Sequence, residues 1–333
     1  MRPFYEIFLL ILLLPFLAVS QKPGCTDNQA INYDSLSTIN NGSCIYGRTF
    51  FSLPNTVDLP SALHELSGMV YWNGYFWGHN DSGNGPWLYA FDTTSGVVRK
   101  VIGLQGASNI DWEDITQDST HFFIGDFGNN SNGDRTGYQI YKVPKWLMDG
   151  EKDTVMLDSA QYSIIQFTYA DQTDYHPTGP NKTKFDCEAM FYDDGMLHLV
   201  TKNWIGDYAV HYTLPVARGI QIAARVDSIH TSGFLITAAD KIYDDVIILT
   251  AYNPSGSCRL YLVYGFKNET EYFTWGNKRV IDIPAANITG QLEAICFLGN
   301  RYIAIGSERF RFSAFDVLQN FRKFSIRQWI NDH

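Results

Sequence analysis

The fold is decided by a phrase that recurs along the chain, and its clearest copy runs Val101-Ile102-Gly103-Leu104 and then Asp111-Trp112-Glu113-Asp114-Ile115. In this phrase a short apolar strand leads through a turn to an acidic residue, and two more strands follow. The other copies span residues 56–60 with 65–69, 164–169 with 186–190, 228–230 with 238–240, and 280–284 with 291–295. Self-similarity of this kind indicates a repeat architecture.

The spacing of the acidic residues indicates which architecture it is. Starting from Glu65, they follow at steps of 48, 75, 52 and 53 residues, and the long step contains a loop-like insertion at 170–184. A period near 50 with about four short strands per repeat is typical of a β-propeller. We therefore predict an all-β propeller with five blades, and six blades are the alternative.

The two ends of the repeat region predict how the ring closes. The strand expected at 49–59 matches the fourth strand of the other units, whereas the last unit shows only three, at 294–297, 301–305 and 314–317. The N-terminal strand can supply the missing outer strand, which removes two open sheet edges. A β-sandwich would not predict this offset.

Composition and charge exclude several classes of protein. The 333 residues are 45% hydrophobic and 18% charged, which excludes disorder, coiled coil and collagen-like structure. The chain has 25 basic and 35 acidic residues, a formal net charge of −10. Because nucleic acid requires a basic surface, we expect no nucleic-acid partner, and cations are more plausible ligands. We further expect a monomer.

The first residues resemble a targeting segment. An apolar run at 7–17 precedes the small residues 18–20, which predicts a signal peptide over 1–20 and a secreted or periplasmic protein. The run has about 11 apolar residues, well below the roughly 20 that span a bilayer, so we expect no stable membrane insertion.

A small cysteine-bracketed, Asp/Asn-rich module is expected at 21–47, followed by the propeller at 48–333. We expect a disulfide between Cys25 and Cys44, since export makes disulfides possible. Oxygens of Asp27, Asn32 and Asp34 could hold calcium, or the module could be a spacer whose polar residues are only solvated. The remaining cysteines lie in apolar contexts typical of buried thiols.

The repeated acids predict a site. In a propeller, residues that enter equivalent inner strands surround one mouth of the central channel, and a cation would relieve the repulsion between neighbouring carboxylates. The predicted ligands of a Ca²⁺ ion are Glu65, Glu113, Glu188, Asp240 and Glu293. Ion pairing with Lys or Arg side chains is another solution. Alternatively, the repeated acids bind no ligand and only accept hydrogen bonds from backbone N–H groups of the turns, which would give them a purely structural role.

In each unit of a propeller, the loop between the second and third strands lies at the same end as the loop that leads into the inner strand. Residues of both loops are therefore expected at the same mouth of the channel. One of these loops combines an acid, glycines and Arg135 within residues 125–135. The predicted ligand-binding residues are Asn80, Asp81, Asp126, Arg135, Lys202, Tyr252, Glu308 and Arg309.

Several phrases also carry a family resemblance across roughly residues 50–315. They are 65–68, 79–83, 111–114, 125–129 with Arg135, 186–189 and 291–294. These phrases resemble secreted bacterial propellers related to the esterase-like phytase and SdiA-regulated propeller proteins. The stretch 24–46 resembles a short module of secreted Bacteroidetes proteins. The propeller resemblance implies calcium binding and phosphoester hydrolysis, although few basic residues line the expected mouth for a highly phosphorylated substrate.

Three functions remain open from the sequence. The first is a secreted propeller whose acidic Ca²⁺ site binds a small or polymeric polar ligand, such as a sugar or a phosphorylated molecule. The second is a Ca²⁺-dependent phosphoester or carboxylic ester hydrolase in which Glu113 or Glu188 acts as general base. The third is a structural propeller whose face binds a protein partner.

Overall fold

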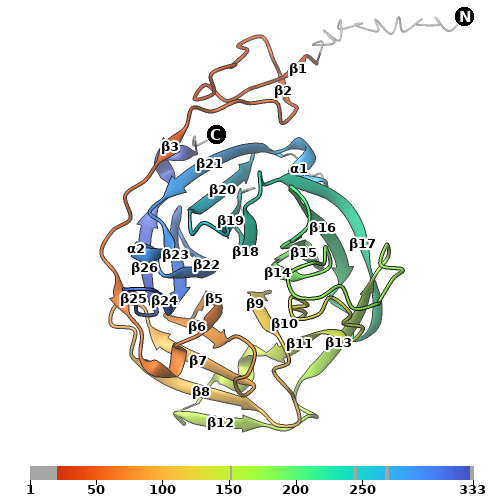
Figure 1. Cartoon of the computed structure of the whole chain (residues 1–333), viewed down its shortest axis with the longest axis vertical. Helices are drawn as coiled ribbons and strands as arrows, with labels where there is room; N and C mark the ends of the chain where they lie inside the picture. The colour runs from red at the N-terminus through yellow and green to blue at the C-terminus, as the bar shows by residue number, and fades with distance from the viewer. Residues whose placement is uncertain (1–20, 151, 243–245, 267–269, 331–333) are drawn as a thin grey trace, which may run out of the picture.

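The strands surround a central axis in this computed structural model, which describes residues 21–150, 152–242, 246–266 and 270–330 (Figure 1). The predicted all-β propeller is confirmed. The innermost strands contact one another in the closed order β5, β9, β14, β18, β22 and back to β5. The predicted signal segment at 1–20 lies outside the described residues.

Each inner strand begins a four-stranded unit. The first two units contain β5 (Leu66–Trp72), β6 (Tyr75–Asn80), β7 (Trp87–Asp92), β8 (Val98–Leu104), β9 (Trp112–Gln117), β10 (His121–Asp126), β11 (Tyr138–Pro144) and β13 (Ser163–Tyr169). The next two contain β14 (Cys187–Asp193), β15 (Met196–Thr201), β16 (Tyr208–Pro215), β17 (Gly219–His230), β18 (Leu235–Ile242), β19 (Val246–Tyr252), β20 (Cys258–Tyr264) and β21 (Asn277–Ile283). The last contains β22 (Gln291–Gly299), β23 (Tyr302–Glu308), β26 (Asn320–Ser325) and β4 (Val57–Asp58).

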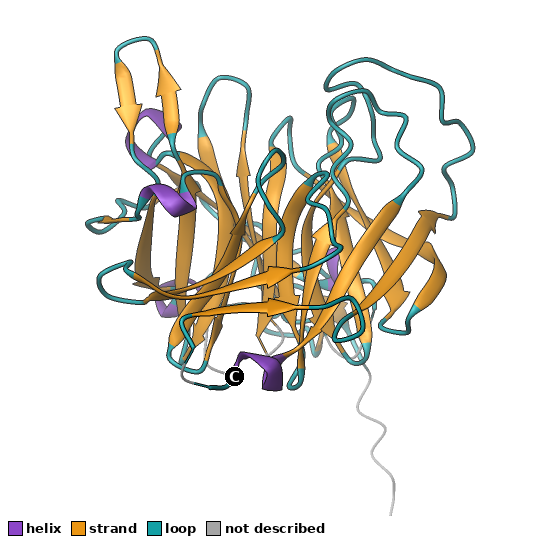
Figure 2. Ribbon diagram, turned by 90° about the horizontal axis from the view of Figure 1, so that it is seen from below, coloured by secondary structure: helices purple, strands orange, loops and turns teal. Residues whose placement is uncertain are grey.

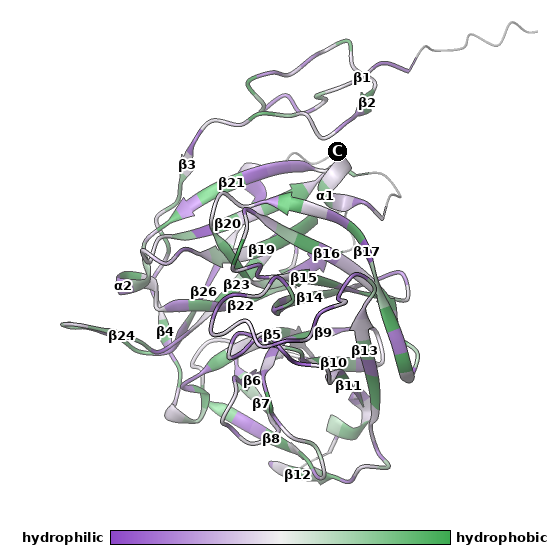
Figure 3. Cartoon of the chain, turned by 45° about the vertical axis from the view of Figure 1, so that its right-hand side comes forward, coloured by the Kyte–Doolittle hydropathy of each residue, from purple (hydrophilic) through white to green (hydrophobic). Residues whose placement is uncertain are grey.

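Local sequence explains these strands and their turns. Apolar and polar residues are interspersed along the strands, as expected for sheets packed against one another (Figure 3). The inner hairpin of the first unit turns at Asn73 and Gly74, whose φ angles of 49° and 86° suit the tight turns that match strand twist. Loops and turns lie at the two ends of the strands, where a site can form (Figure 2).

Short additional elements connect the units or lie at the edges of their sheets. Helical turns occupy η1 (Ser61–Leu63), η2 (Lys145–Met148), α1 (Tyr272–Trp275), α2 (Ala286–Thr289) and η3 (Arg327–Trp329). Strand β12 (Thr154–Leu157) pairs in parallel with β8, and a parallel contact between β13 and β17 joins the second and third units into one eight-stranded sheet. Thus 145–157 and the loop at 170–184 both lengthen the 75-residue step. Among the described residues, no helix is long and apolar enough to cross a membrane.

The N-terminal strand closes the ring as predicted, with one correction in the last unit. Strand β4 pairs with β26, while β3 (Thr49–Phe50) pairs in parallel with β21 of the preceding unit. The third strand of the last unit is β26, not residues 314–317. Those residues instead belong to a separate hairpin of β24 (Phe310–Phe312) and β25 (Phe315–Val317).

The segment around β1 (Pro23–Gly24) and β2 (Ile39–Asn40) lies beside the propeller (Figure 1). The predicted disulfide between Cys25 and Cys44 is present. Asp27 accepts hydrogen bonds from the hydroxyls of Tyr46, at 2.7 Å, and of Tyr264 in β20, at 2.8 Å. The oxygens proposed as calcium ligands are thus used to fold this segment, and in the case of Asp27 to attach it to the propeller.

The remaining cysteines, Cys187, Cys258 and Cys296, are buried and free, as expected for residues in strands that pack against neighbouring sheets. The core lies between adjacent sheets rather than in the channel. Between the first and second units, for example, Trp77 in β6 packs against Phe122 in β10.

Polar side chains fasten the inner strands together. Asp114 in β9 is fully buried and accepts hydrogen bonds from the backbone N–H groups of Met190 in β14, at 2.7 Å, and Ala239 in β18, at 3.2 Å. It also accepts one from the N–H of Ile115 at 2.8 Å. Asp114 therefore holds three inner strands in register, directly below the mouth at which the site lies.

Removing this carboxylate should weaken the whole ring. Asp114→Ala leaves three buried N–H groups without their acceptor, so we expect the free energy of unfolding to fall by about 3 kcal/mol. Denaturant unfolding measures this change, and Asp316→Ala, at an exposed ion pair with Arg309, is the control. Equal stability of the two variants would contradict the role given to Asp114.

Candidate functional site

The inner strands share one irregularity that creates the site. In each of them a β-bulge leaves one residue near the start of the strand without an opposite partner. A bulge bends the strand and re-aims the side chain of the extra residue. The bulged residues are Ser67, Glu113, Glu188, Thr237 and Glu293.

This set corrects the predicted ring of acids. Glu113, Glu188 and Glu293 occupy equivalent positions as predicted, but Glu65 and Asp240 do not. Glu65 lies two residues before the bulge of β5 and is half-buried. Asp240 lies three residues after the bulge of β18, where its carboxylate accepts a hydrogen bond at 2.8 Å from the N–H of Phe297. Asp240 thus joins β18 to β22 in the way that Asp114 joins its own neighbours.

A polar pocket of about 230 Å³ opens at this end of the channel. Four of its lining residues, Ser67 and three glutamates, are bulged residues, and the others come from loops around the mouth or, like Tyr252 and Gln291, from the ends of strands. The lining residues are Ser67, Asp81, Glu113, Asn130, Asn181, Glu188, Lys202, Trp204, Tyr252, Gln291 and Glu293.

Carboxylates gather on one side of this pocket in two groups that could each hold a metal ion. The first group is Asp81, Asp111 and Glu113, and the second is Glu113, Asp186 and Glu188. Within each group the candidate ligand oxygens all lie within 4.8 Å of one another. The Oε1 atoms of Glu113 and Glu188 are buried and have no hydrogen-bond partner among the described residues. A buried charged group without a partner is costly, so these oxygens are suited to a cation.

Burial and mutual repulsion raise the pKa values of these acids. Burial raises the pKa of Glu113 well above its ordinary value, and the charges of Glu188 and Asp81 add to the effect. The pKa of Asp111 rises to about 7, mainly through burial and then through the charge of Asp81. Burial also raises the pKa of Glu188, against the opposing charge of Lys202. A cation that keeps these groups ionised would therefore displace protons on binding.

Lys202 is the basic side chain of the pocket lining within the described chain. Its Nζ lies 3.0 Å from Oε2 of Glu188, and both side chains are almost completely buried. The same Nζ lies 5.0 Å from the ring centre of Trp204 and 5.1 Å from that of Tyr252. Trp204 is fixed in turn by its indole N–H, which donates to Asp186 at 2.6 Å. One wall of the pocket is therefore acidic, and the other presents an ammonium between two aromatic rings.

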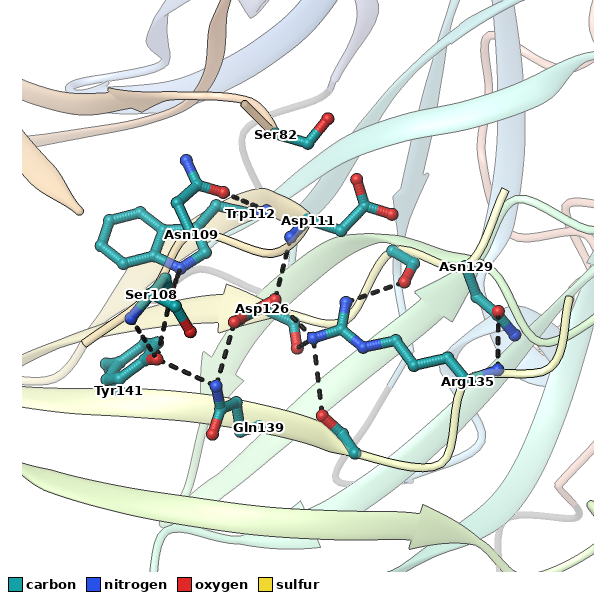
Figure 4. Close-up of polar contacts among 12 residues, drawn as sticks. Ser82, Ser108, Asn109, Asp111, Trp112, Asp126, Asn129, Arg135, Gln139 and Tyr141 are labelled. Atoms are coloured by element: carbon teal, nitrogen blue, oxygen red, sulfur yellow. Dashed lines mark hydrogen bonds and ion pairs between the residues drawn. The ribbon is translucent and has the colours of Figure 1, made fainter. Parts of the chain in front are cut away.

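The predicted ligand-binding pair Asp126 and Arg135 instead supports the site from below (Figure 4). Asp126 is fully buried and pairs with Arg135, and its carboxylate also accepts hydrogen bonds from the N–H of Asp111 and from Gln139. Arg135 donates to the carbonyl of Gly128 at 2.9 Å. The pair therefore positions Asp111 and Gly128, and neither of its members lines the pocket.

The other predicted ligand-binding residues divide between the pocket and its surroundings. Asp81, Lys202 and Tyr252 line the pocket. Asn80 is buried and donates to the carbonyl of Ala62 at 2.9 Å, which makes it a structural residue. Two more residues lie outside the lining, namely Glu308, whose pKa is raised by burial and the charge of Glu293, and Arg309, which pairs with Asp316.

Sequence reasoning missed several residues of the site. Asp111 and Asp186 precede the bulged glutamates by two residues, and this repeated Asp-x-Glu pattern is a signal that could have identified them. Asn130 and Asn181 are brought together by a backbone hydrogen bond of 2.9 Å from the N–H of Asn181 to the carbonyl of Asn130. No sequence signal pairs these two loops. The other missed residues are Ser67, Trp204 and Gln291.

The fold and the site define a propeller with a buried acidic pocket at one mouth of its channel. Among solved structures, the chain is similar to the PQQ-bound aldose sugar dehydrogenase of Streptomyces coelicolor, with 10% identity, a TM-score of 0.43, and 82% of this chain and 97% of that one covered. It is also similar to the Malassezia sympodialis allergen Mala s 1, with 10% identity, a TM-score of 0.47, and 84% and 99% covered. A putative 6-phosphogluconolactonase from Bacteroides uniformis has 10% identity, a TM-score of 0.38, and 83% and 71% covered. No protein-family model and no curated protein sequence matches the chain.

The acidic wall depends on a glycine, which allows a direct test of its geometry. A Cβ atom on Gly128 would collide with Oε1 of Glu113 and Oδ2 of Asp111. We expect Gly128→Ala to displace both carboxylates and to weaken Ca²⁺ binding about tenfold or more, as measured by isothermal titration calorimetry. Gly137→Ala, in the same loop but with open space around its Cβ, should leave the affinity unchanged. Equal affinities in the two variants would contradict this geometry.

Proposed function

We propose that the pocket binds a divalent cation, Ca²⁺ in the first place, and uses it to hold a polar ligand. The observation that carries the proposal is the pair of buried, unpartnered oxygens, Oε1 of Glu113 and Oε1 of Glu188, within two groups of candidate metal ligands. Purely architectural acids in this protein look different, since Asp114 and Asp240 accept backbone hydrogen bonds.

The donor set favours calcium. Ca²⁺ takes six to eight oxygen ligands, with carboxylates and amide or backbone carbonyls as its usual donors. The carboxylates of Asp81, Asp111, Glu113, Asp186 and Glu188 would hold the ion, and no sulfur or imidazole belongs to either group. The predicted ligands Glu65, Asp240 and Glu293 lie outside both groups, and Glu293 is a further lining acid of the pocket.

The other wall supports a small polar ligand, or the end of a polymeric one, that carries hydroxyl or anionic groups. Asn130 and Asn181 offer amides that can both donate and accept hydrogen bonds. Trp204 and Tyr252 offer ring faces on which a sugar can stack. Lys202 offers a positive charge for a phosphate or carboxylate. A single lysine supports a ligand with one anionic group better than a highly phosphorylated one.

Hydrolysis is the second candidate, and the buried, unpartnered oxygens of Glu113 and Glu188 within the candidate metal groups favour it. A bound Ca²⁺ supplies charge stabilisation for a phosphoryl or ester oxygen. Glu113 or Glu188 would accept a proton from the attacking water. The resemblance of the repeat phrases to esterase-like phytase propellers is consistent with this candidate.

We also propose that the protein acts in the periplasm or outside the cell. The Cys25–Cys44 disulfide supports this location, because such bonds persist in oxidising compartments.

Calcium titration tests the proposed function. We expect chelator-stripped protein to bind Ca²⁺ with measurable heat and to melt at a higher temperature with it, because a ligand that binds only the folded state stabilises that state. Glu113→Gln and Glu188→Gln remove carboxylate charge from the pocket, so each should weaken binding by at least about tenfold. The same variants, assayed for release of phosphate or of an ester chromophore, distinguish binding from hydrolysis.

Glu65→Gln is the matched control for this titration, because Glu65 is an acid near the same mouth that belongs to neither carboxylate group. Its affinity should remain within about twofold of the native value. If the stripped native protein gives no heat and no change in melting temperature, the proposed function is wrong.

A further inference from the structure

The two carboxylate groups of the pocket overlap in one residue. Glu113 belongs to both, whereas Asp81 and Asp111 belong only to the first, and Asp186 and Glu188 only to the second. The residues come from three neighbouring units: Asp81 from the loop after β6, Asp111 and Glu113 from the start of β9, and Asp186 and Glu188 from the start of β14. Glu113 therefore belongs with Asp81 and Asp111 of the first and second units and also with Asp186 and Glu188 of the third.

The dimensions of each group fit one ion. Oxygens bind Ca²⁺ at 2.3–2.6 Å, so two ligands on opposite sides of an ion are separated by about 5 Å. The candidate oxygens of each group lie within 4.8 Å of one another, which agrees with this span. A single ion at the centre of the first group would not contact Asp186 and Glu188. A single ion at the centre of the second group would not contact Asp81 and Asp111.

Charge balance favours two ions. The five carboxylates of the two groups carry five negative charges when ionised, and a single divalent ion would leave three of them uncompensated in a mostly buried pocket. Lys202 compensates part of the second group, since it pairs with Glu188. With two divalent ions and Lys202, the charge of the five carboxylates is neutralised.

Two further observations mark this place as a site for ligands. Oε1 of Glu113 and Oε1 of Glu188 are buried without a hydrogen-bond partner in the described chain, and their residues are 3% and 2% exposed. Gly128 leaves the space into which the carboxylates of Glu113 and Asp111 project.

We infer that the pocket binds two divalent cations side by side, with Glu113 bridging them. This inference rests on the proposed function and deepens it from a single ion to a pair. Paired metal ions about 3.5–4 Å apart are suited to hold one anionic group between them, such as a phosphate or a carboxylate. Lys202 lies beside Glu188, where it can contact the same group.

Manganese tests the inference, because Mn²⁺ also binds carboxylate oxygens and is paramagnetic. We expect the chelator-stripped full chain to bind two Mn²⁺ ions in equilibrium dialysis and to give an electron paramagnetic resonance spectrum with exchange coupling between them. Asp81→Asn and Glu188→Gln each affect only one group, so each should bind one ion and lose the coupling. Glu113→Gln should lose the coupling and weaken both ions.

Asp316→Asn, at an exposed residue outside the pocket lining, should keep two coupled ions. Circular dichroism and melting temperature establish that each variant is folded. If Glu113→Gln fails to fold, Asp81→Asn, in a loop, still tests the inference. One uncoupled ion per native chain, lost in Glu188→Gln or in Asp81→Asn but not in both, would overturn the pair and leave the proposed function intact. No bound ion would overturn both.

Discussion

The β-bulge near the start of each inner strand is the feature on which the site depends. A regular strand would alternate its side chains between the two faces of its sheet, toward the neighbouring units. The bulge releases one residue from this alternation, and in three of the inner strands that residue is a glutamate: Glu113, Glu188 or Glu293. Because the inner strands surround one axis, four of the five bulged residues line a single pocket at the channel mouth.

The acids of the inner strands divide into two kinds, and hydrogen bonding distinguishes them. Asp114 and Asp240 accept hydrogen bonds from backbone N–H groups of neighbouring inner strands. These bonds satisfy the carboxylates, so the two residues connect the strands without any cation. Glu113 and Glu188 each have a buried oxygen that the described chain leaves unpartnered. Burying a carboxylate oxygen without a partner lowers the stability of the fold. An architectural role does not explain this loss, so we assign a function to Glu113 and Glu188.

The surroundings of the pocket keep this costly arrangement in place. Arg135 compensates Asp126, and together they fix the loop whose Gly128 makes room for the acids. Lys202 compensates Glu188 and lies between the aromatic rings of Trp204 and Tyr252. Arg135 and Lys202 are thus already engaged, and neutralisation of the remaining carboxylates requires other cations or protons.

Much of the fold follows from the sequence, because repeat spacing and turn residues are local properties. The propeller, the closing N-terminal strand and the Cys25–Cys44 disulfide could all be predicted. The third strand of the last unit could not, because residues 314–317 and 320–325 both have apolar strand-like patterns and only hydrogen bonding separates them.

The site was predictable only where residue type and bulge position coincide. Aligning the copies by their acids places Glu113, Glu188 and Glu293 at bulged positions, but the bulged residues of β5 and β18 are Ser67 and Thr237, which are not acidic. The bulge is a property of hydrogen-bond register, which composition does not encode. Likewise, a loop sequence with Asp126 and Arg135 does not reveal whether the pair faces a pocket or supports it.

The central claim is that bulged glutamates gather carboxylates around metal ions, and anomalous X-ray scattering from a crystal grown with Mn²⁺ tests it most directly. We expect two anomalous peaks about 3.5–4 Å apart, one beside Asp81 and Asp111, one beside Asp186 and Glu188, and both in contact with Glu113. A pocket without an anomalous peak, with Lys202 or hydrogen-bonded carboxyl pairs filling the space between the acids, would contradict it.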